Sequence, residues 1–267
     1  MHKKVNWKLP LLIVVTIGIY YIYDVKFSGP KGPFKIDADS VVFKRGCASS
    51  ESACLKLKFV FPSVTSDGAG KVTKKLFSDY LQMLEDSVAV STMNEFKSRL
   101  VDNCMRFDSS YQEYVNEFPD DSYIAWYLDV NFDVLRNDGR ILTLKYLYSD
   151  YMGGAHGMYN YHYQNFDVKK SRFINLDDVF ESKDGFVSIA KAEFVNKFFD
   201  DQTSTVRLNT SKDEFSLPRE FGFGDKGLIL HYNVYEIASY AEGDIVFEIP
   251  YAKLNGVLKP DWKYLLE

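Results

Sequence analysis

The stretch YMGGAHGMYNYHYQ, Tyr151–Gln164, lies near the middle of a chain of 267 residues. Three glycines surround an alanine and a histidine in it, and glycine adopts positive φ angles without steric cost. The segments on both sides alternate with a period of two residues. Their same-face side chains are Leu142, Leu144, Tyr146 and Tyr148 upstream and Tyr159, Tyr161 and Tyr163 downstream. This pattern predicts two strands joined by a tight connection that carries His156.

His156 has two interpretations at this stage. Connections between strands hold a large share of binding and catalytic residues, which makes His156 a candidate site residue. A glycine pair between two strands is also an ordinary turn, in which case the histidine has no role of its own. The sequence leaves both interpretations open.

The composition is that of a globular protein with 46% hydrophobic and 26% charged residues, and its 16% aromatic content favours sheet. The net charge is −5. After residue 26 the chain holds 28 lysines and arginines against 36 aspartates and glutamates. Binding to nucleic acid needs a basic surface, so we expect no nucleic-acid partner. A basic protein partner suits this charge, although the charge also serves solubility alone.

The N-terminus reads as a membrane-targeting segment. Residues 1–8 are basic, with Lys3, Lys4 and Lys8, and residues 9–23 form the uncharged run LPLLIVVTIGIYYIY. Such an order is typical of a signal sequence. No small-residue cleavage site follows, so residues 1–26 are expected to be a short cytoplasmic end and an uncleaved signal anchor. The alternative is a cleaved signal that leaves a secreted or periplasmic protein.

Residues 27–33 form a linker rich in glycine and proline, and the rest of the chain predicts an α+β protein. Strands are expected at 41–43, 55–61, 123–136, 141–151, 158–167, 215–222, 227–232 and 245–249. Helical patterns cover 71–86, 92–116 and 184–199, with a short helical piece in 174–180. Turn-linked neighbours favour antiparallel sheets with helices packed on one face. A breaker at 118–122 divides a small unit, 34–121, from a larger one, 122–267, and leaves open whether they share a sheet.

Three cysteines occur in the sequence. Cys47 and Cys54 flank the connection between the first two strands, seven residues apart, and export permits a disulfide between them. Cys104 lies on the apolar stripe of the second helix and is expected to be a buried thiol.

Several segments together resemble a known family. They are YMGGAHG at 151–157, NFD at 165–167, INLDDVF at 174–180, GLILHYNVYEIASYA at 227–241 and IPY at 249–251. In this order they look like the extracytoplasmic domain shared by the RsiV anti-sigma factor and relatives of the peptidoglycan deacetylase PdaC. The unit before residue 122 resembles the small PdaC-like domain that precedes it there.

The resemblance implies an extracytoplasmic α+β domain pair that binds a protein. In the anti-sigma member of the family this domain pair binds and inhibits lysozyme. Only about eight residues precede the apolar run, so we expect no sigma-sequestering domain. No segment remains for the metal-dependent catalytic domain of the deacetylase relatives. The sequence therefore predicts a membrane-anchored protein that binds and inhibits a lysozyme-type cell-wall hydrolase, in defence or immunity. The alternative is an envelope protein that binds peptidoglycan or another glycan without inhibition.

Candidate binding residues come from the central stretch and from the connection between the last two strands, which one interpretation places beside it. They are Tyr151, Gly153, Gly154, His156, Tyr159, Tyr161, Tyr235, Glu236 and Tyr240. The alternative is that the tyrosines only pack and Glu236 only caps a backbone amide. A glycan would stack on Tyr159, Tyr161 and Tyr163.

Catalysis is not expected. The histidines after residue 26 are His156, His162 and His231, and none has the spacing of a zinc motif. No G-x-S-x-G elbow is present, and the aspartate pairs at 120–121 and 177–178 suit turns or caps. We therefore expect no metal, no cofactor and no enzyme, while an unrecognised hydrolase that uses His156 remains the contrary hypothesis.

Overall fold

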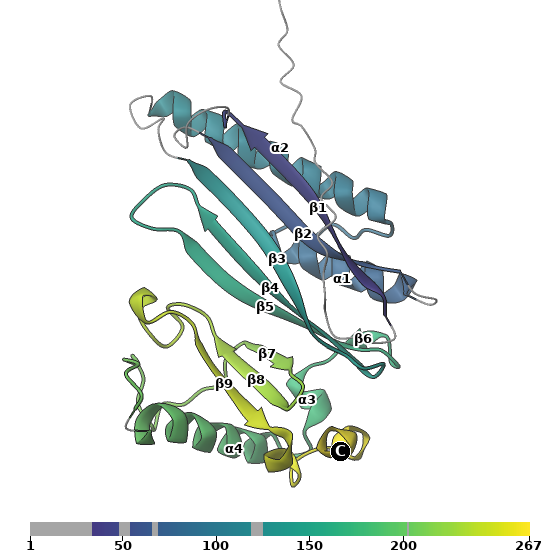
Figure 1. Cartoon of the computed structure of the whole chain (residues 1–267), viewed down its shortest axis with the longest axis vertical. Helices are drawn as coiled ribbons and strands as arrows, with labels where there is room; N and C mark the ends of the chain where they lie inside the picture. Colours follow the sequence, from purple (N-terminus) through teal and green to yellow (C-terminus); the bar gives the residue numbers. More distant parts are fainter. Residues whose placement is uncertain (1–33, 48–53, 66–68, 119–124, 202) are drawn as a thin grey trace, which may run out of the picture.

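The computed structural model describes residues 34–47, 54–65, 69–118, 125–201 and 203–267. In order along the chain, two strands and two helices precede four more strands, and a three-stranded sheet with further helices follows. Figure 1 shows the two sheets side by side, with the larger one above. The α+β class expected from the sequence is confirmed.

The larger sheet has six strands in the order β1-β2-β3-β4-β5-β6. Their bounds are β1 (Ile36–Arg45), β2 (Leu55–Val64), β3 (Trp126–Asn137), β4 (Ile141–Tyr151), β5 (Met158–Asp167) and β6 (Arg172–Phe173). Strands from both predicted units, 34–121 and 122–267, thus belong to one sheet.

One pairing differs from the all-antiparallel expectation, because β2 and β3 run parallel. Two helices, α1 (Gly70–Met83) and α2 (Met93–Glu117), lie between them in sequence. A long helical crossover returns the chain to the same end of the sheet, which makes the next strand parallel. The turn signals that predict antiparallel pairs are local and do not reach across this crossover.

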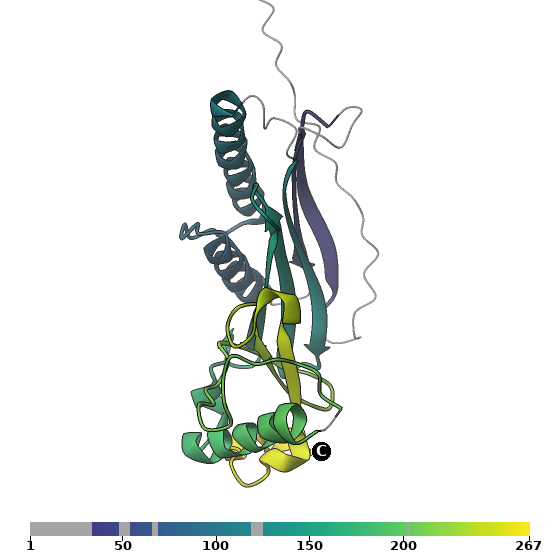
Figure 2. The same ribbon diagram turned by 90° about the vertical axis from the view of Figure 1, so that its left-hand side faces the viewer.

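The helices α1 and α2 cover one face of the six-stranded sheet (Figure 2), as the sequence predicts. The helix α2 begins with a capping box in which Thr92 Oγ1 accepts from the Glu95 amide at 3.1 Å. Between helices and sheet lies an aromatic core. Its central rings are those of Phe61, Phe77, Tyr80, Phe96 and Tyr146.

The first strand is longer than the expected 41–43. Aspartates 37 and 39 interrupt the apolar pattern that marks a strand, yet β1 pairs with β2 from Ile36 to Arg45. Asp39 also forms an ion pair with Lys97 of α2 at 2.6 Å. Pairing with a neighbour therefore overrides the local composition.

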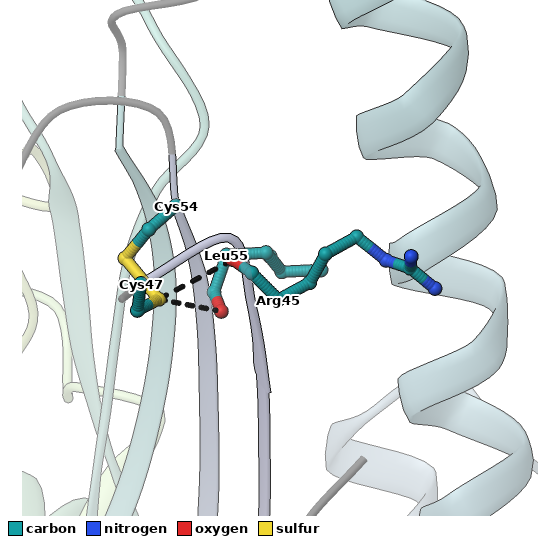
Figure 3. Close-up of a disulfide and its surroundings, with 4 residues drawn as sticks. All are labelled: Arg45, Cys47, Cys54 and Leu55. Carbon is teal, nitrogen blue, oxygen red and sulfur yellow. Dashed lines mark hydrogen bonds between the residues drawn. A yellow bond between two sulfur atoms is a disulfide. The ribbon is translucent and has the colours of Figure 1, made fainter. Parts of the chain in front are cut away.

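The predicted disulfide between Cys47 and Cys54 is present, with the two Cα atoms 4.8 Å apart. Figure 3 shows that it closes the β1–β2 connection, with the Cys47 sulfur 3.3 Å from the Arg45 carbonyl oxygen. The Arg45 side chain extends the other way and donates to Asp108 of α2, with Nη2 2.6 Å from Oδ2. Cys104 is buried as expected, and burial raises the pKa of its thiol to about 12.

The smaller sheet is antiparallel, with β7 (Glu220–Phe223), β8 (Gly227–Tyr232) and β9 (Ile245–Pro250). It packs on α4 (Lys183–Val195), which continues as a π-helical turn, Asn196–Asp200. The short helix α3 (Leu176–Val179) precedes α4, and three 3₁₀ helices follow at Tyr240–Glu242, Tyr251–Leu254 and Pro260–Leu266. Its core is separate from that of the larger sheet and is rich in phenylalanine.

The strand expected at 215–222 is wrong in its first half, because β7 begins only at Glu220. Pro218 has no backbone N–H to give to a sheet, and the Ser216 carbonyl accepts the Tyr232 hydroxyl instead.

The predicted signal anchor, residues 1–26, and the linker, 27–33, lie outside the described residues. Within the ranges that the structure describes, no helix is both long and apolar enough to cross a membrane.

Candidate functional site

The connection between β4 and β5 is built by its glycines. Gly153 and Gly154 have φ angles of +94° and +96°, which other residues rarely adopt. The Tyr151 hydroxyl donates to the Gly154 carbonyl at 2.9 Å and closes the turn. A Cβ on Gly157 would lie 2.5 Å from the Asp150 carbonyl oxygen, so only glycine fits there. Gly153, Gly154 and Gly157 therefore shape the turn, as predicted.

The connection between β8 and β9 is a second ordered turn. Glu236 Oε2 accepts the Asn233 amide at 2.9 Å, so Glu236 caps a backbone group, as its alternative interpretation predicts. Tyr235 adopts a φ angle of +66°, an uncommon value for a bulky residue. The Tyr235 side chain is 54% exposed.

These two connections meet. The His156 ring stacks on the Tyr240 ring with centroids 4.1 Å apart and planes 22° apart. His156 Nε2 lies 3.2 Å from the Tyr235 hydroxyl, and Tyr159 packs edge-on against Tyr240 at 5.8 Å. We call His156, Tyr159, Tyr235 and Tyr240 the aromatic platform. Four of the predicted site residues, from segments about 80 positions apart, thus form one accessible surface.

The other predicted residues support the platform or lie behind it. The Tyr161 amide donates to Asn233 Oδ1 at 2.6 Å, and Asn233 Nδ2 donates back to the Tyr161 carbonyl at 2.9 Å. The side-chain amide of Asn233 thereby imitates a neighbouring strand at the edge of β5. The Tyr161 ring is covered by Lys145, whose Nζ is 4.1 Å from the ring centroid.

The sugar-stacking face expected on Tyr159, Tyr161 and Tyr163 does not form. Tyr163 is only 7% exposed, and its hydroxyl lies 2.9 Å from His231 Nδ1. The Tyr161 ring contacts the His231 ring as well as Lys145, with the two ring centroids 4.6 Å apart. The smaller sheet packs against this face of β5, and the sequence pattern of β5 alone does not predict that contact.

His231 belongs to a buried polar cluster between the two sheets. It is fully buried, and its Nε2 lies 3.1 Å from Asp244 Oδ2 without the alignment of a hydrogen bond. Burial lowers the pKa of His231 to about 4 and outweighs the opposing effect of the Asp244 charge, while the charge on Lys145 lowers it further. A histidine with no exposed surface cannot touch a substrate in this conformation, so the cluster is a joint between sheets.

His162 is the residue whose role the sequence did not predict. Its Nε2 lies 2.8 Å from Asp79 of α1, and its Nδ1 lies 3.2 Å from Glu220 of β7. Burial alone would lower the pKa of His162, but the hydrogen bonds with both carboxylates outweigh it and raise the pKa to about 10. The partners are 83 and 58 residues away in sequence, so no spacing rule could have found them.

His156 and His162 point to different partners and do not form a pair. In the part of the chain that the structure describes, no group of three or more histidine, cysteine, aspartate or glutamate side chains could hold a metal ion.

Two family models match the chain. The model described as deacetylase PdaC matches residues 48–159, and the model described as a protein of unknown function, DUF3298, matches residues 177–252. The two matches follow each other along the chain in the order that the sequence resemblance predicts. No curated protein is similar enough in sequence to count as a match.

Solved structures of DUF3298 proteins share the fold. One, from Bacteroides fragilis, is 20% identical, covers 89% of this chain and 98% of its own, and gives a TM-score of 0.65. Another, from Pseudomonas aeruginosa, is 17% identical, covers 87% and 97%, and gives a TM-score of 0.60. The aromatic platform joins the two matched regions, since His156 and Tyr159 lie in the first and Tyr235 and Tyr240 in the second.

Proposed function

We propose that this chain, which carries a PdaC-like region and a DUF3298 region, is an extracytoplasmic binding protein. Its partner is a lysozyme-type cell-wall hydrolase, which it binds and inhibits. The proposal rests on the resemblance to RsiV-like domains and on one structural observation, the exposed aromatic platform assembled from both regions.

The chemistry of the platform suits a protein partner. Interface energy concentrates in a few residues, and tyrosine is among the types enriched there. Tyr235 is strongly exposed, and the contact of its hydroxyl with His156 Nε2 at 3.2 Å restrains its side chain, which reduces the freedom lost on binding. The stacked His156 and Tyr240 rings beside it add a flat, rigid area.

Charge supports the same partner class. The chain after residue 26 is acidic, and complementary charge raises the rate at which a basic partner associates. The Cys47–Cys54 disulfide supports an oxidising location outside the cytoplasm. Attachment to the membrane through residues 9–23 is part of the proposal.

Binding of the purified chain to lysozyme and a panel of other muramidases tests the proposal. We expect binding at micromolar concentration or tighter, and a loss of at least tenfold, about 1.4 kcal/mol, for Tyr240→Ala and for Tyr235→Ala. Met105→Ala is the matched control, because Met105 is a 43% exposed apolar residue on α2, away from the platform. The absence of binding to every enzyme of the panel would contradict the proposal.

Inhibition is a separate measurement. The rate at which each muramidase clears a suspension of cell walls should fall with added protein, and the platform variants should need higher concentrations for the same effect. We expect no catalysis by the chain itself. Release of acetate or of wall fragments by the protein alone would contradict a pure binding role.

A further inference from the structure

A second accessible feature lies next to the platform. A cavity of about 640 Å³ opens between the end of α1, the outer edge of β5 and the turn after β8. Its volume falls within the roughly 300–1,000 Å³ of small-molecule sites. Of the four platform residues only Tyr235 lines this cavity. The cavity is therefore a distinct site that shares Tyr235 with the platform.

The floor of the cavity is polar, with its charges largely balanced. His162 lies between Asp79 and Glu220, and all three side chains keep part of their surface accessible. Arg219 and Glu236 add one charge of each sign to the lining. With His162 protonated, the five groups sum to a single negative charge. Such a lining does not select a strongly charged ligand such as a phosphate.

The rim carries unused hydrogen-bonding groups. Asn160, Gln82 and Arg219 are exposed, and their side-chain amides and guanidinium have no hydrogen-bond or ion-pair partner among the residues that the structure describes. They come from three different elements, since Asn160 lies in β5, Gln82 in α1 and Arg219 just before β7, and together they offer donors and acceptors on planar groups. Side-chain amides present both an acceptor and donors, and a guanidinium presents donors, so the three groups together suit hydroxyl groups, which donate and accept.

Apolar surface completes the lining. Tyr235 lines the cavity with its side chain 54% exposed, its backbone has a φ angle of +66°, and its hydroxyl lies 3.2 Å from His156 Nε2. Strain of this kind persists only where the surroundings fix it, and it is concentrated at functional sites. The ring and the neighbouring Met83 face a ligand that has one apolar side as well as hydroxyl groups.

An extended peptide is a poor fit, because the strand edge that would receive it is already occupied. The Tyr161 amide and carbonyl are bonded to Asn233, and the Tyr163 amide donates to Glu220 Oε2 at 2.8 Å. Strand addition needs these backbone groups to be free. The side chains of the lining remain as the recognition groups.

We propose that this cavity is a saccharide-binding site, in which Asn160, Gln82 and Arg219 bind ring hydroxyl groups and Tyr235 covers the apolar face of a sugar ring. The ligand class follows from the near-neutral polar floor, the planar rim groups and the exposed ring. The site goes beyond hydrolase binding and does not depend on it.

Calorimetric titration of the purified full chain tests the site with two soluble probes, a β-1,4-linked tetramer of N-acetylglucosamine and a β-1,4-linked tetramer of glucose. We expect the wild type to bind at least one tetramer and the double variant Asn160→Ala/Arg219→Ala to bind it at least tenfold more weakly. Both residues are exposed, so the variant should keep its thermal unfolding midpoint. Met105→Ala should bind as the wild type does.

Platform variants separate this proposal from the hydrolase interaction. Tyr240→Ala should retain saccharide binding while losing muramidase binding, and the cavity double variant should show the reverse. The site is overturned if neither tetramer binds at about 10 mM, a concentration that detects millimolar affinity. It is equally overturned if the double variant binds the tetramer as tightly as the wild type.

Discussion

The His162 side chain receives one carboxylate from each of two elements, α1 and β7. Because its folded-state pKa of about 10 exceeds the usual 6.5, the folded protein holds a proton that the unfolded chain releases between these values. The stabilisation is therefore complete below pH 6.5 and is lost as the pH rises toward 10. Since the side chain is about one-third exposed, we expect a loss of about 2 kcal/mol.

Urea unfolding of the wild type and His162→Gln at pH 6, 8 and 10 measures this contribution. The difference between the two proteins should be largest at pH 6 and should shrink as the pH rises. A difference that is equal at all three values would show that His162 contributes no charge.

For His231 we predict the opposite dependence of stability on pH. It stays neutral in the folded protein because burial lowers its pKa to about 4, whereas the unfolded chain takes up a proton near pH 6.5. Stability should therefore fall as the pH decreases from 6.5 to 4. The variant His231→Gln should be less stable than the wild type at pH 7. Its thermal unfolding midpoint should change less between pH 6.5 and 4. A wild-type midpoint that does not move between pH 6.5 and 4 would contradict the prediction.

At the scale of elements, the β4–β5 hairpin depends on one close approach. Gly157→Ala would place a methyl group 2.5 Å from the Asp150 carbonyl, and relieving that clash should cost about 1–3 kcal/mol in unfolding free energy. The control is Gly70→Ala, where the added Cβ meets nothing within 4 Å at the start of α1. This control should be neutral or slightly stabilising. Equal effects of the two changes in urea unfolding would refute the close-contact explanation.

The elements also separate what a sequence can predict from what it cannot. The helix that starts near residue 92, the turn of the hairpin around the central glycines and the Cys47–Cys54 bridge depend on neighbouring residues of the sequence, and all three were predicted. The parallel pairing of β2 with β3 follows from a crossover of some 60 residues, and it was missed.

The candidate site divides in the same way. The aromatic residues of both connections were predicted, and so was their possible meeting, because each turn is visible in the local pattern. The place of His162 between Asp79 and Glu220 was not predicted, since those partners come from distant elements that only packing brings together. Burial of Tyr163 was missed for the same reason, because the covering sheet is formed by residues 220–250.

At the scale of the molecule, the six-stranded sheet crosses the predicted boundary at residues 121–122. A chain that ends at residue 121 would keep β1, β2, α1 and α2 but would lose the partner strand of Leu55–Phe59. We expect residues 34–121 alone to lack a cooperative thermal transition, whereas residues 34–267 should unfold cooperatively. Calorimetry of both fragments decides this, and a sharp transition for 34–121 would mean that the small unit folds alone.

The Asn233 side chain has a consequence for self-association. A strand at the edge of a sheet is a template on which other copies of a chain can stack into fibrils. At Tyr161 the amide of Asn233 takes up both backbone groups that such stacking would use. Its flat side chain cannot propagate a further strand, so it ends the hydrogen-bonded array at that point. We therefore expect Asn233 to hinder the pairing of folded molecules along this strand edge.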